Sequence, residues 1–150
     1  MKLKIPPALQ VAIFATLMWI IKKTTTFIHF DFEEQKTVSW IVFGMGMLIE
    51  IIAIYAFRKA RTTANPLHPS KTSKLVIVGI YKISRNPMYL GMLFILVAFV
   101  VELGNLFTFP ILILYVWYIT IFQIKPEEKV LTKLFGSDYS TYCTKVRRWI

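Results

Sequence analysis

The sequence predicts an all-α integral membrane protein with four transmembrane helices, followed by short cytoplasmic and interfacial helices in its C-terminal part. Hydrophobic residues make up 56% of the 150 residues. The mean hydropathy of +0.58 exceeds what the core of one soluble domain of this size requires. Four apolar stretches have about the length that crosses a hydrocarbon core of roughly 30 Å. A chain of 150 residues has the length of one domain, so we expect a single membrane domain over residues 1–150.

Each predicted span is recognised by its apolar length and by the polar residues that bound it. The four spans cover about residues 5–21, 39–57, 88–103 and 109–124. A short connection around Gly104 separates the last two spans, which predicts a tight helical hairpin. Pro87, after Asn86, begins the third span, and Pro110 lies at the start of the fourth. Proline is favoured in a first helical turn because the N–H that it lacks would have no partner there.

The placement of charge predicts the orientation of these spans. Of the 18 Lys and Arg, 2 precede the first span, 3 lie between the first and second, 7 between the second and third, and 6 after the fourth. Basic residues mark the cytoplasmic side of a membrane. Both termini and the segments 58–87 and 125–150 are therefore expected to be cytoplasmic. The net charge of +10 would there meet anionic lipid head groups, so we do not expect nucleic-acid binding.

Cysteine and histidine usage excludes two common kinds of site. Cys143 is the only cysteine, so no intramolecular disulfide can form. The two histidines, His29 and His68, are predicted on opposite sides of the membrane, and no metal-ligand cluster is visible. We therefore expect no metal. Gly44 and Gly46 form a GxG pair inside an apolar span, which favours close helix packing over nucleotide binding.

A basic motif at the start of the third span predicts an anion site. Residues 85–89 place the guanidinium of Arg85, the amide of Asn86 and the phenol of Tyr89 around a helix N-terminus. Unpaired backbone N–H groups and the helix dipole favour a carboxylate or phosphate at such a position. The alternative is that Arg85 only reaches out to lipid phosphates.

The C-terminal segment offers a complementary acidic motif. Pro126 is expected to start a short helix with Glu127 and Glu128 in its first turn. Acids suit the helix dipole there, and this alone would explain them. However, the apolar residues that follow define a helix face on which Glu127 lies near the centre, so at least one carboxylate is expected to point towards the membrane. An acid close to the basic motif suggests a site for a zwitterion.

A second helix is expected after Gly136, which should end the first one. Its apolar and aromatic residues recur on one face: Tyr139, Tyr142, Val146 and Trp149. Basic residues flank this face. We expect an interfacial helix that lies on the membrane with its aromatic rings at the depth of the head groups.

Two motifs occur in order, one on each side of the predicted hairpin. The first comprises Gly79-Ile80-Tyr81, Arg85-Asn86-Pro87-Met88-Tyr89 and Gly91, and the second comprises Glu127-Glu128, Leu131, Phe135-Gly136, Tyr139, Tyr142 and Val146. Over about residues 65–150 the chain thus resembles the isoprenylcysteine carboxyl methyltransferase family and the related phospholipid methyltransferases. The resemblance implies an integral membrane enzyme that binds S-adenosylmethionine between the cytoplasmic ends of the last helices and the C-terminal segment.

The resemblance also implies roles for the matching residues. Those expected at the cofactor are His68, Val78, Gly79, Ile80, Tyr81, Asn86, Pro87, Tyr89, Glu127 and Glu128. Those expected to take part in catalysis are Arg85, Asn86, Tyr89 and Glu128. His68 is the weakest match, because a single loop histidine is more often a surface residue. Asn86 stands where the eukaryotic prenylcysteine enzymes usually have histidine, so their substrate is not implied.

The implied reaction is an in-line displacement of the sulfonium methyl group by a lipid-borne or prenylated acceptor. A carboxylate acceptor arrives ionised and could be held by Arg85. An amine acceptor must first lose a proton, for which a glutamate is the candidate base. Two other functions remain open: an NADPH-dependent membrane sterol-type reductase, whose Arg-x-Pro-x-Tyr pattern is similar, and a non-catalytic lipid-binding membrane protein.

Glu50 is an ionisable residue near the middle of the second span. A charged side chain at that depth costs about 3 kcal/mol on insertion scales. We therefore expect Glu50 to face the helix bundle and to pair with a polar group there.

Overall fold

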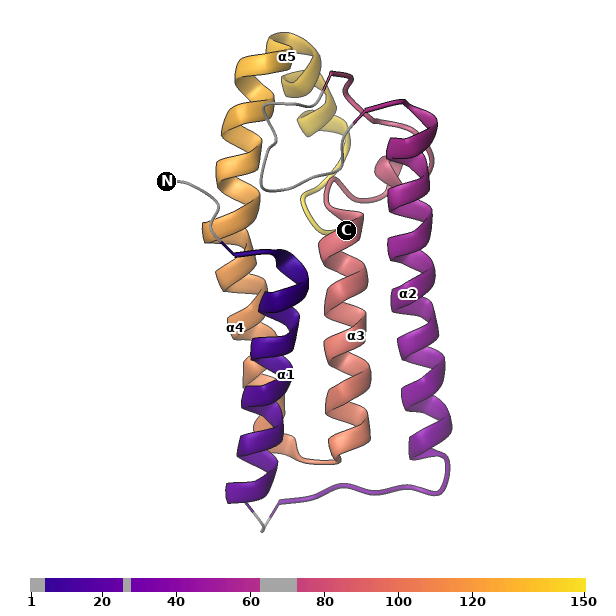
Figure 1. The fold of residues 1–150 in the computed structure, drawn as a ribbon, viewed down its shortest axis with the longest axis vertical. Coiled ribbons are helices and arrows are strands. Elements are labelled where there is room, and N and C mark those ends of the chain that lie inside the picture. The colour runs from indigo at the N-terminus through magenta and orange to yellow at the C-terminus, as the bar shows by residue number, and fades with distance from the viewer. Residues whose placement is uncertain (1–4, 26–27, 63–72) are drawn as a thin grey trace.

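The computed structural model describes residues 5–25, 28–62 and 73–150, and all regular elements in these ranges are helical. In chain order they are α1 (Pro7–Thr24), α2 (Gln35–Lys59), the 3-10 turn η2 (Gly79–Lys82), α3 (Pro87–Leu103), the 3-10 turn η3 (Leu106–Thr108), α4 (Phe109–Ile119), the π-helical turn η4 (Thr120–Ile124) and α5 (Lys125–Lys145). Figure 1 shows the long helices side by side in one bundle. The all-α fold class is thus confirmed for the described residues.

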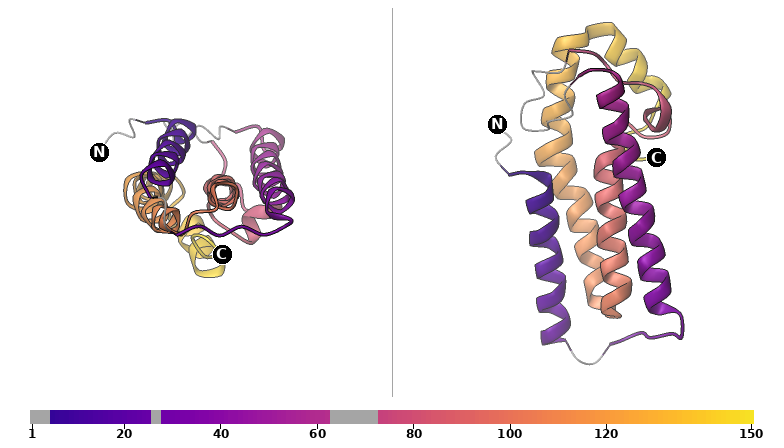
Figure 2. Two further views of the ribbon diagram at one scale, coloured as in Figure 1. Left: turned by 90° about the horizontal axis from the view of Figure 1, so that it is seen from below. Right: turned by 45° about the vertical axis from the view of Figure 1, so that its right-hand side comes forward.

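The helix α3 lies at the centre of the bundle. Seen along the bundle axis, α1 and α4 lie on one side of it and α2 on the other (Figure 2). The core between α1, α3 and α4 consists of buried apolar side chains, among them Phe14, Met18, Leu96, Val100, Tyr115 and Ile119. The Phe14 and Tyr115 rings pack edge to face with centroids 5.4 Å apart. This apolar core holds α4, and with it the start of α5, against α1 and α3.

Two glycines allow α2 and α3 to approach closely. A Cβ placed on Gly46 would lie 2.8 Å from the carbonyl oxygen of Gly91, and one placed on Gly91 would lie 2.8 Å from the carbonyl oxygen of Gly46. Both distances are too short for any real side chain. The Ser39 hydroxyl donates to the Ala98 carbonyl at 3.0 Å further along the same contact. The packing role expected of the GxG pair thus applies to Gly46, whereas Gly44 has no atom within 4 Å of such a Cβ.

Within the described ranges, two helices are long and apolar enough to cross a membrane. They are α2 and the continuous helical stretch Leu106–Lys145, while α3 is apolar but shorter. The predicted spans 39–57 and 88–103 correspond to α2 and α3, and the span 5–21 corresponds approximately to α1. Pro87 and Pro110 lie in the first turns of α3 and α4, as expected.

The segment after residue 124 differs from the prediction, because Pro126 does not begin a separate helix. The chain runs from α4 through the π-helical turn into α5 without a break. A proline inside an α-helix clashes with the preceding turn and cannot donate to it. The wider turn directly before Pro126 relieves this conflict, so the helix continues where the sequence suggested a start.

Gly136 ends the first part of α5, as predicted. Its backbone angles, φ 50° and ψ −120°, are non-helical and lie where side chains are rarely tolerated. The chain turns back there, and Figure 1 shows the last part of α5 descending towards the start of α3. The predicted interfacial face is corrected by this turn: Tyr139, Tyr142 and Val146 are buried against the protein itself, and the helix ends at Lys145 before Trp149.

The connections fall at two opposite ends of the bundle. At one end, the segment after α1 pairs with the hairpin turn through the bridge between His29 and Asn105. The Asn105 amide also donates to the Thr25 carbonyl at 3.0 Å. At the other end lie the start of α3, η2 and the second half of α5 (Figure 2). This arrangement brings both predicted site motifs to the same end of the molecule.

Candidate functional site

The candidate site forms where the start of α3 meets α5 and the residues after α5. The turn at Gly136 brings residues 146–149 back over the helix start, where the Arg85 N–H donates to the Arg147 carbonyl at 3.0 Å. The Tyr142 hydroxyl donates to the Tyr81 carbonyl at 2.6 Å, which ties η2 to α5. Three segments distant in sequence therefore enclose one group of polar side chains.

Glu127 is held by neutral hydrogen-bond donors. Its Oε1 atom accepts a hydrogen bond from the Tyr89 hydroxyl at 2.5 Å and one from the Gln123 amide at 3.4 Å. The Gln123 oxygen in turn accepts from the Gln10 amide of α1 at 3.4 Å. Gln10, Tyr89 and Gln123 are all buried. Among the described residues, Glu127 has no cationic partner within ion-pair distance.

This environment raises the pKa of Glu127 to about 7, chiefly because burial penalises the charged carboxylate. The hydrogen bonds from Tyr89 and Gln123 act in the opposite direction, and the neighbouring charge of Glu128 raises the pKa further. Glu127 thus lies in a place where a cation would be strongly favoured.

Glu128 has the opposite environment, because two arginines surround it. Arg148 binds it with two hydrogen bonds, from Nε to Oε1 at 3.0 Å and from Nη2 to Oε2 at 2.8 Å. Arg85 approaches Oε1 at 3.3 Å from the other side. Such a two-point contact between guanidinium and carboxylate fixes orientation as well as charge. Glu128 is therefore already compensated, and it holds Arg85 in place.

The Nε atom of Arg85 has no partner among the described residues. Its Nη1 atom donates to the Cys143 sulfur, and its Nη2 atom faces Glu128. Its Nε atom is buried and has no hydrogen-bond partner in the part of the chain that the structure describes. A buried donor of a charged group without a partner is costly, so this atom favours an anionic ligand.

The Asn86 side chain forms a hydrogen bond with the C-terminal residues instead of capping α3. Its side chain does not cap α3. Instead, its Nδ2 atom donates to the Arg148 carbonyl at 2.9 Å. The Ser84 hydroxyl donates to the same carbonyl at 3.4 Å and accepts from the Asn86 N–H at 3.1 Å. Asn86 therefore helps to position Arg148 over the site.

The segment 78–81 joins the site only in part. The Tyr81 ring is buried and packs edge to face on Phe57 with centroids 5.4 Å apart. Val78 is 55% exposed, and Gly79 has a φ of 61° with no atom within 4 Å of an added Cβ. Tyr81 thus joins the site through its carbonyl, whereas Val78 and Gly79 are exposed and Ile80 is half-buried.

The predicted site residues therefore divide into three groups. Arg85, Asn86, Tyr89, Glu127 and Glu128 lie together, and Pro87 is buried among them at the first turn of α3. Tyr81 joins the site through its carbonyl, and Val78, Gly79 and Ile80 precede it in the chain. His68 lies outside the described residues.

Sequence reasoning missed four residues of this group: Gln10, Gln123, Cys143 and Arg148. The two glutamines carried a signal that was overlooked, because each is a lone polar residue in or next to an apolar span, and such residues usually face a polar interior. Arg148 carried no such signal in the sequence, because its position at the site depends on the turn at Gly136.

Glu50 faces the bundle as predicted, but the predicted polar partner is missing for one of its oxygens. Its Cγ lies against α3, where a Cβ on Gly91 would be only 2.6 Å away. Its Oε1 atom is buried, and no described residue forms a hydrogen bond with it.

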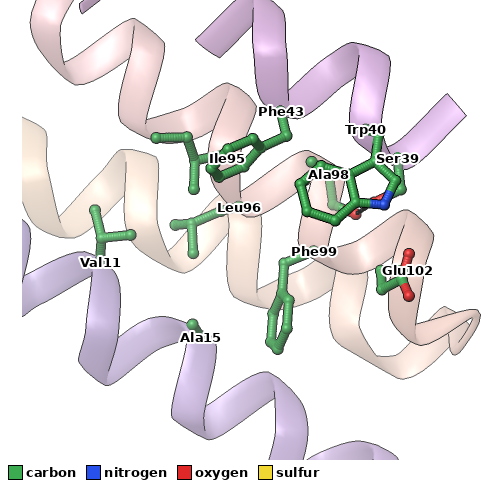
Figure 3. Close-up of a pocket in the computed structure, with 10 residues that line it drawn as sticks. All are labelled: Val11, Ala15, Ser39, Trp40, Phe43, Ile95, Leu96, Ala98, Phe99 and Glu102. Carbon is green, nitrogen blue, oxygen red and sulfur yellow. Dashed lines mark hydrogen bonds between the residues drawn. The ribbon is translucent and has the colours of Figure 1, made fainter. Parts of the chain in front are cut away.

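A cavity of about 290 Å³ opens between α1 and α2 over the surface of α3. Figure 3 shows Val11 and Ala15 of α1 across from Trp40 and Phe43 of α2, with Ile95 and Phe99 of α3 between them. The walls are almost entirely apolar, and Glu102 lies at the end nearer the hairpin. Trp40 is 63% exposed, so the cavity is open on one side.

Comparison with known proteins agrees with the two motifs. A family model described as phospholipid methyltransferase matches residues 35–138. An uncharacterised protein of Haemophilus influenzae is 43% identical over 63 residues, which are 42% of this chain and all of that protein.

Two relatives carry functional names. A probable protein-S-isoprenylcysteine O-methyltransferase of Oryza sativa subsp. indica is 29% identical over 119 residues, or 77% of this chain. The protein-S-isoprenylcysteine O-methyltransferase of Saccharomyces cerevisiae is 33% identical over 109 residues, or 68% of this chain. The matches cover 62% and 46% of these two longer proteins.

Proposed function

Because the chain belongs to the phospholipid methyltransferase family, we propose that it is a membrane methyltransferase that transfers the methyl group of S-adenosylmethionine to a lipid-borne or prenylated acceptor. The acceptor supplies a carboxylate or an amine as the nucleophile. The pairing of Glu127, a half-buried acid with no cation from the described residues, with Arg85, a half-buried cation whose buried Nε atom has no partner among them, carries this proposal. S-adenosylmethionine bears an ammonium and a carboxylate at one end, and these two groups complement that pair.

Glu127 is the group we assign to the cofactor's ammonium. Glu128 is already neutralised by Arg85 and Arg148, whereas Glu127 is held only by the neutral donors of Tyr89 and Gln123. An ammonium at Glu127 would supply the missing countercharge. Glu128 then acts through the two arginines, and Tyr89 fixes the carboxylate of Glu127.

The rest of the site has mainly to align the reactants and exclude water. In the displacement, the acceptor's lone pair forms the new bond to the methyl carbon while the carbon–sulfur bond breaks and its electrons neutralise the sulfonium. Charge is dispersed in this transition state, so orientation and a dry environment contribute more than new electrostatic contacts. The residues from Val146 to Trp149, folded over the start of α3, provide such a cover. An amine acceptor must also lose a proton, and a carboxylate of the site is the candidate base.

We place this chemistry at the cytoplasmic face of the membrane. In this arrangement α1, α2, α3 and the α4–η4 stretch cross the bilayer, and both termini are cytoplasmic. The support is the distribution of basic residues in the sequence, because 15 of the 18 precede the first predicted span, lie between the second and third, or follow the fourth.

Calorimetric titration with S-adenosylmethionine tests the assignment. Glu127→Gln is expected to weaken binding by roughly ten- to a hundredfold, because one charge-assisted hydrogen bond of about 1.5 to 3 kcal/mol is lost. Glu33→Gln, the same change in the exposed loop before α2, is the matched control and should bind as the parent does. Arg85→Ala should also lower affinity if Arg85 holds the cofactor's carboxylate, and should lower only turnover if it holds the acceptor.

Two results would contradict the proposal. If the parent protein binds NADPH and not S-adenosylmethionine, the reaction is a reduction instead. If Glu127→Gln and Arg85→Ala both bind the cofactor as tightly as the parent, the pocket lies elsewhere and the family shares only its fold with this chain.

A further inference from the structure

Two buried glutamines connect Glu127 to the first helix of the bundle. Gln123 of η4 donates from its Nε2 atom to Glu127 Oε1 at 3.4 Å, and Gln10 of α1 donates from its Nε2 atom to Gln123 Oε1 at 3.4 Å. Gln10 and Gln123 are only 3% and 2% exposed. Polar side chains buried among membrane helices are costly, and they commonly have a functional role. The proposed methyl transfer assigns no role to Gln10.

The backbone at the start of α1 determines how the Gln10 amide is oriented. Its Nε2 atom also donates to the Ile5 carbonyl at 2.8 Å. A carbonyl oxygen can only accept a hydrogen bond, so Gln10 must direct its NH2 group to that side. If the amide were turned over, its oxygen would face two acceptors, the Ile5 carbonyl and Gln123 Oε1. The Ile5 carbonyl therefore fixes which atom Gln10 presents to η4.

The orientation of Gln10 in turn fixes that of Gln123. Because Gln10 presents an N–H group, Gln123 directs its oxygen to α1 and its NH2 group to Glu127. An N–H group directed at Glu127 favours the ionised carboxylate, whereas an oxygen in that place would favour the protonated carboxyl. All donors in this chain of hydrogen bonds point towards Glu127, and such an arrangement strengthens successive bonds.

The remaining amide atom of Gln10 shows that this orientation has a cost. Its Oε1 atom is buried and accepts no hydrogen bond from the described part of the chain. A buried oxygen without a donor is unfavourable. The orientation is therefore explained by what the NH2 group does for Ile5 and Gln123, and not by the needs of the Gln10 oxygen.

The position of Gln10 is set by the face of α1 that packs on α4. Gln10 precedes Phe14 by four residues, so both lie on one face of the helix. The Phe14 ring packs edge to face on Tyr115 of α4, and Figure 2 shows the two helices side by side. The matched family segment, residues 35–138, begins after α1. Gln10 is therefore a contact to the site from a helix outside that segment.

We propose that Gln10 is a positioning residue for the cofactor site: through Gln123, it keeps an N–H group directed at the Glu127 carboxylate. The inference rests on the proposed function, in which this carboxylate binds the ammonium of S-adenosylmethionine. Loss of Gln10 would free the Gln123 amide to turn its oxygen towards Glu127. The carboxyl would then keep its proton more readily and bind the ammonium less well.

The pKa of Glu127 depends on few other groups. The titratable side chains that interact with it from the surrounding elements are Tyr81 of η2, Tyr89 of α3 and Glu128 of α5. The guanidinium groups of Arg85 and Arg148 contact Glu128 instead. The hydrogen bonds from Tyr89 and Gln123 are what lower the pKa against the effect of burial. A change in the Gln123 amide should therefore appear directly in the titration of Glu127.

The test is calorimetric titration of the full chain with S-adenosylmethionine between pH 5.5 and 7. Gln10→Leu should shift the fall in affinity to higher pH and should lower the affinity at pH 6 by roughly two- to tenfold, because one neutral hydrogen bond no longer favours the carboxylate. Leucine has nearly the volume of glutamine, so the packing of α1 is retained. Thr16→Val is the matched control in α1, since Thr16 is exposed and its hydroxyl donates to the Ala12 carbonyl of the same helix. It should keep the parent's affinity and pH profile.

Two double variants separate positioning from packing. In the Glu127→Gln background and in the Gln123→Leu background, Gln10→Leu should cause no further loss of affinity, because the group through which Gln10 acts is gone. If Gln10→Leu lowers the affinity as much in either background as in the parent, Gln10 only supports the packing of α1 and the inference is overturned.

The cofactor-free protein provides a second readout. The infrared band of a protonated carboxyl that is missing in Glu127→Gln should disappear at a higher pH in Gln10→Leu than in the parent. If the parent binds no S-adenosylmethionine, the proposed function fails and the role of Gln10 at the cofactor fails with it. If the parent binds the cofactor but Gln10→Leu keeps the parent's pH profile or carboxyl titration, only the positioning role of Gln10 is overturned.

Discussion

Two adjacent glutamates in α5 differ in what holds them, and under the proposed function this difference assigns Glu127 rather than Glu128 to the cofactor. Glu128 binds Arg148 at two points and faces Arg85, so its charge is compensated within the chain. From the described part of the chain, Glu127 accepts hydrogen bonds only from Tyr89 and Gln123. The two residues are adjacent in the same sequence motif. Their side chains are about 100° apart around the helix axis and therefore point to different partners.

The pH dependence of cofactor binding should report on Glu127. Burial raises its pKa to about 7, so below pH 7 the free protein carries a protonated, neutral Glu127. The ammonium of S-adenosylmethionine binds the ionised carboxylate, so a protonated Glu127 must lose its proton when the cofactor binds. Affinity for S-adenosylmethionine should therefore fall by about tenfold for each pH unit below 7. Titration between pH 5.5 and 7, where an α-amino group keeps its proton, measures this.

The variant Glu127→Gln provides the control for that profile. It lacks the titrating carboxyl, so its weaker affinity should stay nearly constant over the same pH range. A parent affinity that does not change between pH 5.5 and 7 would argue against contact between Glu127 and the ammonium.

At the scale of whole elements, the contact between α2 and α3 is the closest helix approach for which glycine is required. Gly46 and Gly91 let the two helices approach until backbone meets backbone. This approach places Glu50 against α3, while a cavity stays open between α1 and α2 over the surface of α3. In membranes, small residues promote such contacts because they give dense packing where the hydrophobic effect cannot drive association.

Gly91→Ala should therefore destabilise the protein. The added Cβ would meet Glu50 Cγ at 2.6 Å and the Gly46 carbonyl at 2.8 Å, and the second of these is backbone that cannot move alone. Overpacking of this kind costs about 1 to 3 kcal/mol. Thermal unfolding in detergent should show a lowered midpoint.

Gly44→Ala is the matched control in α2. No atom lies within 4 Å of its added Cβ. Alanine favours a helix over glycine by about 1 kcal/mol, so this variant should be as stable as the parent or slightly more stable. Equal losses for both variants would mean that the close approach of α2 and α3 does not matter for stability.

The helices could be predicted from the sequence because apolar length and proline position are local signals. Pro87 and Pro110 mark the first turns of α3 and α4 as expected. Pro126 misled the prediction, because a proline that follows a π-helical turn has the same local sequence signature as a helix start. Whether Pro126 begins a helix or lies inside one depends on the geometry of the preceding turn, which the amino-acid composition does not reveal.

At the scale of the whole molecule, the sequence predicts the site contacts that depend on the two local motifs. It does not predict the contacts that depend on the direction of the chain after Gly136. Arg85, Tyr89 and Glu127 could be grouped because the hairpin returns the chain to the same end of the bundle. The partnership of Glu128 with Arg148 could not, because it depends on the direction that the chain takes after Gly136. Tyr139 and Tyr142 were assigned to the lipid surface for the same reason, although they are buried against the protein.

The proposed orientation can be tested by labelling single cysteines, with Cys143 replaced by alanine. An impermeant thiol reagent applied from outside intact cells should modify Asp31→Cys, because three acidic residues in that loop and few basic ones favour the external side. It should not modify Ser73→Cys at the opposite end, which becomes accessible only after permeabilisation. The reverse pattern would place the candidate site outside the cell.

The π-helical turn at Thr120–Ile124 has a consequence for how insertions and deletions would act on this molecule. A π turn holds one residue more than the α-helical turn it replaces, while the helix beyond it keeps its rotational phase. Loss of one residue inside this turn would leave Glu127 facing Tyr89, whereas the same loss within α4 would rotate it by about 100°. However, the straightened helix would clash with the ring of Pro126. The extra residue of the π-helical turn and Pro126 therefore compensate for each other. A variant that loses this residue must also lose the proline if Glu127 and Glu128 are to keep their positions.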